Sequence, residues 1–406
     1  MIVLPIMEEH GTRLGYLIVY ALFFVFVIPQ AVTGSYSVFC AVRFVAGCCA
    51  GVLQTCMDGV IADVWRDGVK MSVPVSCYVG ALLSGVSSGP VFGAIVTGGW
   101  GLNWKWILYF QLIIYGVFFV LVLLIFRETR YPVILEAVTK RQKENSTALV
   151  EKQDNDSKTH YGLGSLAAFL RGNILRPFHL LFTEPVVFFF TLLSALSYGI
   201  TFISTQSVAQ VYSSTYAFSE PQTGFIQGSI VLGEIVGWII CAGIQDRFYE
   251  RCALKAQSDT SGILTRKLPE KRLYAAIPAS FIALAAGLFI YGFTSTRSIS
   301  LYASTTGLFL IGIGVVVVMQ AIMMYVTDAY AKYAASASAA VCFGENIFAA
   351  FLPLGSQGMY SVLGYGWASA LLGFVALLLG LAPVVLVWKG ESVRKRSPFM
   401  REAVYT

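Results

Sequence analysis

The chain has 406 residues, of which 57% are hydrophobic and only 12% are charged, and its formal net charge is +6. Soluble domains carry about 25% charged residues, so this composition excludes an ordinary soluble protein. The basic residues lie beside long apolar stretches and form no basic patch, which argues against nucleic-acid binding.

Apolar stretches of about 20 residues recur along the chain, which is the length that crosses a ~30 Å hydrocarbon core. Residues 1–7 are too short for a span and lack the layout of a signal peptide, so we interpret them as the last turn of a further span. The fold class we expect is an all-α membrane protein with about ten membrane-spanning helices. In chain order, the predicted spans are 14–32, 37–57, 72–96, 104–126, 185–211, 222–243, 273–293, 300–326, 334–354 and 365–388.

Lysine and arginine are concentrated in alternate connections between these spans. One set includes Arg13, the 127–184 segment and the C-terminal tail, whereas the opposite set holds only Lys105 and Arg297. Cytosolic connections of membrane proteins carry the excess of Lys and Arg. The pattern therefore predicts that the first set, including the tail, faces the cytosol.

The 127–184 segment is the longest polar stretch, with charges of both signs and few aromatic residues, which is typical of a flexible linker. It separates a transmembrane half at 1–126 from a six-span half at 185–389, and a cytosolic tail follows at 390–406. Many transporters consist of two related six-span halves. Because only four full spans precede the linker, we expect two pseudo-repeated halves with an incomplete N-terminal half.

Glycines recur at every fourth residue of the 72–96 span, at Gly85, Gly89 and Gly93, with Pro90 among them. In water, a glycine inside a helix costs about 1 kcal/mol and a proline about 3 kcal/mol. In lipid, small residues allow helix backbones to approach closely, and a proline bend is tolerated. The stripe predicts either a crossing at which two bundles rock against each other or plain helix packing.

The stretch GVSSGPVFGA at 85–94 resembles the GxxxGPxxGG motif in the fifth span of drug:proton antiporters of the major facilitator superfamily, with Ala94 in place of the last glycine. RFVAG, followed by GVIADVW, resembles the fourth-span pattern of that family. PIMEEHGTRLGYLI resembles the loop before the third span, although Thr12 stands where an arginine is expected. Other stretches that resemble fungal multidrug members are RETRYPVIL, LRPFHLLFTEP, PEKRL, DAYAKYAASASAA and VRKRSPF.

This resemblance implies a major facilitator-type helical bundle whose spans are equivalent to numbers three to twelve, so that the first span and most of the second are absent. It implies a secondary transporter that exports small amphiphilic or hydrophobic compounds in exchange for protons. The loop motif residues would be Glu8, Gly11 and Arg13. We expect a monomeric, multi-pass membrane protein. Its expected location is the plasma membrane, and the alternative is a vacuolar or other internal membrane.

Charged side chains inside spans are costly and are functional candidates by default. The resemblance implies a role in proton coupling for Arg43, and the further candidates for proton coupling are Asp58, Glu234 and Glu345. Burial disfavours the charged form of a carboxyl, so such a group can take up a proton on one side and release it on the other. The alternatives are snorkelling for Arg43, a cap or gate contact for Asp58, and a neutral acid bonded between helices for each glutamate.

The 185–211 span carries Tyr198, Phe202 and Gln206 at a spacing of four, and Asn346 follows Glu345 on another span. An aromatic face with one amide suits amphiphilic ligands, and core packing or lipid contact is the alternative. We find no GxxxxGK[ST] or HExxH motif and no catalytic nucleophile constellation, so we expect no enzyme activity, metal or other cofactor.

Two further interpretations remain open. The first is an uptake transporter of the same superfamily, which would require a polar cavity. The second is a truncated, non-transporting relic or an interaction protein. The partners expected for the leading interpretation are a small-molecule substrate, protons and the lipid bilayer, with no nucleic acid.

Overall fold

The computed structural model describes residues 11–65, 71–130, 133–135, 138–139, 175–259, 269–330 and 333–405. Within these residues the regular structure is helical, which confirms the expected all-α fold class. The chain forms two compact units. The first draws on residues 1–67 and 103–176, and the second on residues 68–102 and 177–406.

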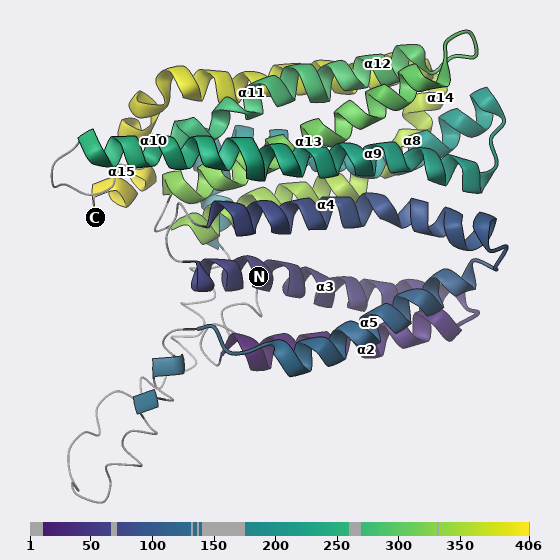
Figure 1. Cartoon of the computed structure of the whole chain (residues 1–406), viewed down its shortest axis with the longest axis horizontal. Helices are drawn as coiled ribbons and strands as arrows, with labels where there is room; N and C mark the ends of the chain where they lie inside the picture. The colour runs from purple at the N-terminus through teal and green to yellow at the C-terminus, as the bar shows by residue number, and fades with distance from the viewer. Residues whose placement is uncertain are drawn as a thin grey trace, which may run out of the picture. The chain divides into compact units, whose positions relative to one another are not determined.

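The first unit contains three long helices, α2 (Thr12–Val32), α3 (Tyr36–Val64) and α5 (Lys105–Ile125). Helix α2 packs against both α3 and α5 (Figure 1). Aromatic side chains fill this contact, since the ring of Tyr20 stacks on that of Phe119 with centroids 5.3 Å apart. The buried residues of the core are Tyr16, Val19, Tyr20, Leu53, Cys56 and Val122.

The second unit contains the other described helices. In it, α9 packs against both α4 and α13 (Figure 1). Helix α4 continues into a π-helical turn, η1, and helix α9 into another, η2. In chain order the elements are α4 (Ser72–Ala94), η1 (Ile95–Gly99), α8 (Pro185–Tyr216), α9 (Glu220–Ile240), η2 (Cys241–Gln245), α10 (Asp246–Asp259), η3 (Pro269–Tyr274), α11 (Ala276–Pro278), η4 (Ala279–Ala285), α12 (Ala286–Thr294), α13 (Leu301–Tyr330), α14 (Ala334–Arg396) and α15 (Pro398–Tyr405).

Nine helices among the described residues are long and apolar enough to cross a membrane. Each of the ten predicted spans matches one of these nine helices, and α14 contains both 334–354 and 365–388. Two predictions extend one residue beyond the helix, namely 104–126 at both ends of α5 and 300–326 at the start of α13. The two parts of α14 are separated at Gly364, whose φ of 76° and ψ of 163° are not helical. A positive φ of this kind favours glycine, so one residue divides an otherwise continuous apolar stretch.

Glycines bring the backbones of α9 and α13 into contact. A Cβ atom added at Gly233 would collide with the carbonyl oxygen of Phe309, and one added at Gly312 would collide with that of Ile230. Close approach of this kind is how helices associate in lipid, where apolar burial between helices gives little driving force. This close contact with α13 determines which face of α9 is left to pack against α4.

Candidate functional site

Glu234 lies in the middle of α9 with its side chain fully buried. The hydroxyl of Ser87, on α4, donates a hydrogen bond of 2.7 Å to Glu234 Oε1. The other oxygen, Oε2, is buried and has no hydrogen-bond partner among the residues that the structure describes. The predicted proton-coupling carboxyl therefore lies within the contact between α4 and α9, where its described hydrogen bond comes from one serine hydroxyl.

The same contact brings the two backbones together at Gly224. A Cβ atom there would lie 2.6 Å from Ala94 Cβ and 2.7 Å from the carbonyl oxygen of Pro90. Beside Gly85 and Gly89, in contrast, no described atom outside their own helix and chain neighbours lies within 4 Å of an added Cβ. The close crossing of α4 with α9 thus uses Pro90 but neither of these two glycines, and a role for the predicted stripe stays a prediction.

Gly93 belongs to the same stripe, and its carbonyl oxygen accepts a hydrogen bond of 2.9 Å from the hydroxyl of Thr97. This bond closes within the helix, from α4 into η1. It satisfies polar groups locally at the end of a span, where an unpaired backbone carbonyl would be costly.

A second carboxyl, Glu345 on α14, accepts a hydrogen bond from the hydroxyl of Ser194 on α8. One turn further along α8, the buried ring of Tyr198 packs edge to face with that of Phe202, with centroids 5.1 Å apart. Another turn on, Gln206 Oε1 accepts a hydrogen bond of 2.8 Å from Ser356, which also belongs to α14.

The spacing of four along α8 therefore places the predicted substrate candidates in one row that adjoins α14. Asn346, the residue after Glu345, is exposed and donates a hydrogen bond of 2.7 Å to the carbonyl oxygen of Cys342 in its own helix. The structure thus brings the two aromatic candidates and the amide of α8 into the contact that holds Glu345, and it leaves the amide of α14 bonded within its helix.

A cluster of ionic groups, which the sequence alone did not reveal, surrounds the fully buried Arg272 of η3. Its Nε donates to Asp328 Oδ2 at 3.0 Å, and its Nη1 lies 3.5 Å from Asp246 Oδ1. The guanidinium also stacks over the ring of Tyr249, 3.4 Å from the centroid.

This cluster reaches α4 through two serines. Arg272 Nη1 donates to Ser72 Oγ at 2.5 Å, and Ser76 donates to Asp246 Oδ2 at 2.6 Å. Ser76 in turn accepts a hydrogen bond of 2.8 Å from Gln320 of α13. The available sequence signal was that charges of both signs lie next to span ends, but nothing in the spacing identifies which of them pair.

In the first unit, Arg43 is exposed and donates a hydrogen bond of 3.3 Å to Gln30 Oε1, so it joins α3 to α2. Asp58 lies on the same helix as Arg43, fifteen residues further on, as expected from the sequence. The side chain of Asp58 and the whole of Glu8 lie outside the described residues.

The described part of the loop motif, which forms the start of α2, contacts the segment that follows α5. The backbone N–H groups of Thr12 and Arg13 each donate 3.0 Å hydrogen bonds to the carboxylate of Glu128. Gly11 has a φ of 104°, and a Cβ atom there would lie 2.8 Å from Glu128 Oε2. This explains why the motif needs glycine at that position.

Burial of Glu128 disfavours its charged form, but four hydrogen bonds from backbone N–H groups outweigh burial, so the pKa of Glu128 is lowered. The donors are the N–H groups of Arg13, Arg130, Thr12 and Thr129. Arg130 in turn pairs with Asp63 at the end of α3, at 3.0 Å. The motif thus links the ends of α2, α3 and α5.

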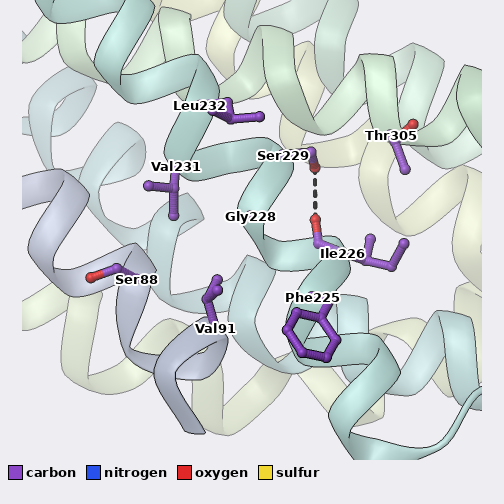
Figure 2. Close-up of a pocket in the computed structure, with 9 residues that line it drawn as sticks. All are labelled: Ser88, Val91, Phe225, Ile226, Gly228, Ser229, Val231, Leu232 and Thr305. Atoms are coloured by element: carbon purple, nitrogen blue, oxygen red, sulfur yellow. Dashed lines mark hydrogen bonds between the residues drawn. The ribbon is translucent and has the colours of Figure 1, made fainter. Parts of the chain in front are cut away.

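Figure 2 shows a pocket of about 430 Å³ formed by α4, α9 and α13. The hydroxyls in its lining donate to carbonyl oxygens of their own helices, as in the 2.8 Å bond from Ser229 to Ile226 and the 2.9 Å bond from Ser88 to Gly85. The pocket therefore presents mainly apolar surface. The lining residues are Ser88, Val91, Phe225, Ile226, Gly228, Ser229, Val231, Leu232 and Thr305.

Comparison with known proteins places these helices in a family. The family model described as Major Facilitator Superfamily matches residues 2–353. The chain is 27% identical to "Uncharacterized transporter mfc1" of Schizosaccharomyces pombe, over 97% of this chain and 80% of that protein. It is 30% identical to "Efflux pump radE" of Floropilus chiversii, over 98% of this chain and 71% of that protein.

Among solved structures, the human organic anion transporter MFSD10 (TETRAN) has a similar fold, with a TM-score of 0.57 and 15% identity. The similarity covers 94% of this chain and 79% of that one. The family match extends across nearly the whole chain, and it gives no support to the expectation that a first span and most of a second are absent.

Proposed function

The chain belongs to the Major Facilitator Superfamily, and from that premise we propose that it is a secondary transporter that exports small amphiphilic compounds in exchange for protons. We also propose that this multi-pass protein is monomeric and lies in the plasma membrane, and that its partners are protons and the substrate. Proton coupling and the kind of substrate rest on the site residues, and the direction of transport rests on the name of one relative.

The observation that carries the proposal is that two carboxyls, Glu234 and Glu345, lie inside apolar helices. Each accepts a hydrogen bond from the hydroxyl of a serine on another helix. A serine hydroxyl is neutral and supplies no counter-charge. A carboxyl in such surroundings favours its protonated form, and it releases the proton when it is exposed to water. Two such groups provide proton-carrying sites that conformational change can expose in turn.

The kind of substrate follows from the side chains near these carboxyls. Tyr198 and Phe202 present an aromatic pair beside the helix that carries Glu345. Aromatic rings with a few polar groups bind compounds that have an apolar body and a polar end. One relative bears the name of an efflux pump, and this supports export over uptake for the present chain.

The experiment is transport in vesicles that contain the full chain, with an imposed pH gradient and a fluorescent amphiphile. We expect Glu345→Gln and Glu234→Gln each to reduce gradient-driven accumulation by at least about tenfold, because each keeps the shape of the side chain and removes its titratable proton. Glu220→Gln is the matched control, since Glu220 is an exposed residue in the first turn of α9.

Unchanged accumulation in both glutamine variants would contradict the assignment of the proton sites. Accumulation that does not respond to the pH gradient in the unmodified chain would contradict proton coupling itself.

A further inference from the structure

We infer that Ser87 is a positioning residue for Glu234, and that the protonation state of Glu234 decides whether α4 remains packed against α9. The inference rests on the proposed role of Glu234 as a proton carrier. It adds the element whose position that proton controls and the residue that links the two.

The geometry of the contact supplies the link. Glu234 is fully buried between the helices, Ser87 Oγ donates to its Oε1 at 2.7 Å, and Oε2 has no hydrogen-bond partner in the described part of the chain. The hydroxyl of Ser87 is thus the hydrogen-bond donor that the structure describes for this carboxyl. A buried ionised carboxylate needs several hydrogen bonds or a cation, and one hydroxyl is a poor substitute for water.

The elements that pack against α9 bring little charge to this position. Helices α4 and α8 and the turns η1 and η2 contain no Asp, Glu, Lys, Arg or His. In α13 the one such residue is Asp328, which pairs with Arg272 at 3.0 Å. The other titratable side chains on these elements are thiols and phenols, namely Cys77, Tyr78, Tyr198, Tyr212, Tyr216, Cys241, Tyr302, Tyr325 and Tyr330.

A proton on Glu234 therefore stabilises the packed arrangement, and its loss puts an uncompensated charge into the contact. The contact has little room for gradual adjustment, because the Gly224 backbone already lies against Pro90 and Ala94. In the packed arrangement Glu234 is fully buried, and separation of the two helices would expose its carboxylate to water. Ionisation of Glu234 thus favours separation of α4 from α9, and protonation favours their association.

Ser87 and its neighbour Ser88 form a matched pair for testing this inference. Both are small hydroxyl residues of α4, but Ser88 donates to the carbonyl oxygen of Gly85 in its own helix, at 2.9 Å. Replacing either by alanine removes one hydroxyl from the same turn. Only Ser87→Ala removes a hydrogen bond to Glu234.

The experiment measures the α4–α9 contact by disulfide formation between cysteines placed at Val91 and Gly228. A Cβ atom at Gly228 would lie 3.9 Å from Val91 Cγ2, so this pair reports the packed arrangement. The full chain carries both cysteines, and mass spectrometry identifies the peptide linked between the two positions. Glu234→Gln in the same background gives the intrinsic pH dependence of thiol oxidation, and every yield is divided by that value.

We expect the normalised yield to fall at least about fivefold as the pH rises, because ionised Glu234 disfavours the packed state. With Ser87→Ala, the midpoint should move to higher pH by about one unit, because a hydroxyl that donates to a carboxylate stabilises its charged form. With Ser88→Ala, the midpoint should not move.

A normalised yield that is independent of pH, or equal midpoints for Ser87→Ala and Ser88→Ala, would overturn the inference. Transport in vesicles by the same variants separates this result from a failure of the proposed function. If the yield is flat while Glu234→Gln still abolishes proton-driven transport, the proton site stands and the helix contact does not respond to it. If Glu234→Gln transports normally, the proposed role of Glu234 fails, whatever the yield.

Discussion

Arg272 and Asp328 form a buried ion pair in which Nε donates to Oδ2 at 3.0 Å, with side-chain exposures of 0% and 3%. The pair connects η3 to α13, and the same guanidinium reaches α4 through Ser72. Charges removed from water in this way are tolerated only when their partners remain in place. The pair therefore indicates that α4 depends on residues far away in the sequence for its packing.

Removing the charge of Arg272 should destabilise the second unit strongly. We expect Arg272→Gln to cost about 3–5 kcal/mol, because it leaves the buried Asp328 and Asp246 without their cation. Thermal unfolding of the chain in detergent measures this. The control is Lys395→Gln, whose exposed pair with Glu391 should contribute less than about 0.5 kcal/mol. Equal melting temperatures for the two variants would contradict the prediction.

Glu128 should stabilise the first unit in a pH-dependent manner. Its pKa is lowered from 4.5 in the folded chain, so its contribution is fully present above about pH 4.5 and is lost as the pH falls through the lower folded value. We expect Glu128→Gln to cost about 1 kcal/mol or less at pH 7, given its partial exposure. The difference from the unmodified chain should shrink as acid is added. A difference that is the same at pH 7 and in strong acid would contradict the charge-based explanation.

Glycines at helix crossings should differ sharply from exposed ones in their tolerance of alanine. Gly233→Ala would place a Cβ against the carbonyl oxygen of Phe309, and we expect a loss of about 1–3 kcal/mol. Gly89→Ala meets open space in the described structure and should be neutral, or stabilising by up to about 1 kcal/mol. Melting temperatures of the two variants in the same detergent test the contrast.

The larger substitution Gly89→Leu addresses the predicted role of the glycine stripe. It should leave the yield of folded protein nearly unchanged, because no described atom outside its own helix and chain neighbours lies within 4 Å of an added Cβ. If the stripe is a surface at which bundles move against each other, transport should fall by about tenfold or more. Normal transport by Gly89→Leu would leave the stripe without a role in movement.

The orientation in the membrane can be tested at position 160 in the linker. The Lys/Arg distribution predicts a cytosolic linker, so a membrane-impermeant thiol reagent added outside sealed cells should not label His160→Cys. Permeabilised cells should then show labelling above the unmodified chain, which carries eight native cysteines. Efficient labelling from outside intact cells would reverse the orientation.

Hydropathy and residue spacing were sufficient to predict the membrane-spanning helices and the position of carboxyls inside them. A bilayer requires long uncharged helices, and this requirement is local, so a sequence records it directly. The presence of Glu234 and Glu345 in mid-span could be recognised for the same reason, since an acid in an apolar stretch is conspicuous. The row along α8 followed from helical spacing alone.

The partners of these groups were decided only by tertiary structure. Ser87 and Ser194 are unremarkable in a sequence that contains many serines, and Ser87 lies 147 positions from Glu234. The cluster around Arg272 likewise assembles groups from four separate elements. Helix crossings in lipid depend on steric fit between small residues. Gly224 meets Pro90, whereas an added Cβ at Gly85 or Gly89 meets no described atom of another helix within 4 Å. Such a fit is a property of two surfaces together, and the pattern of either helix alone does not contain it.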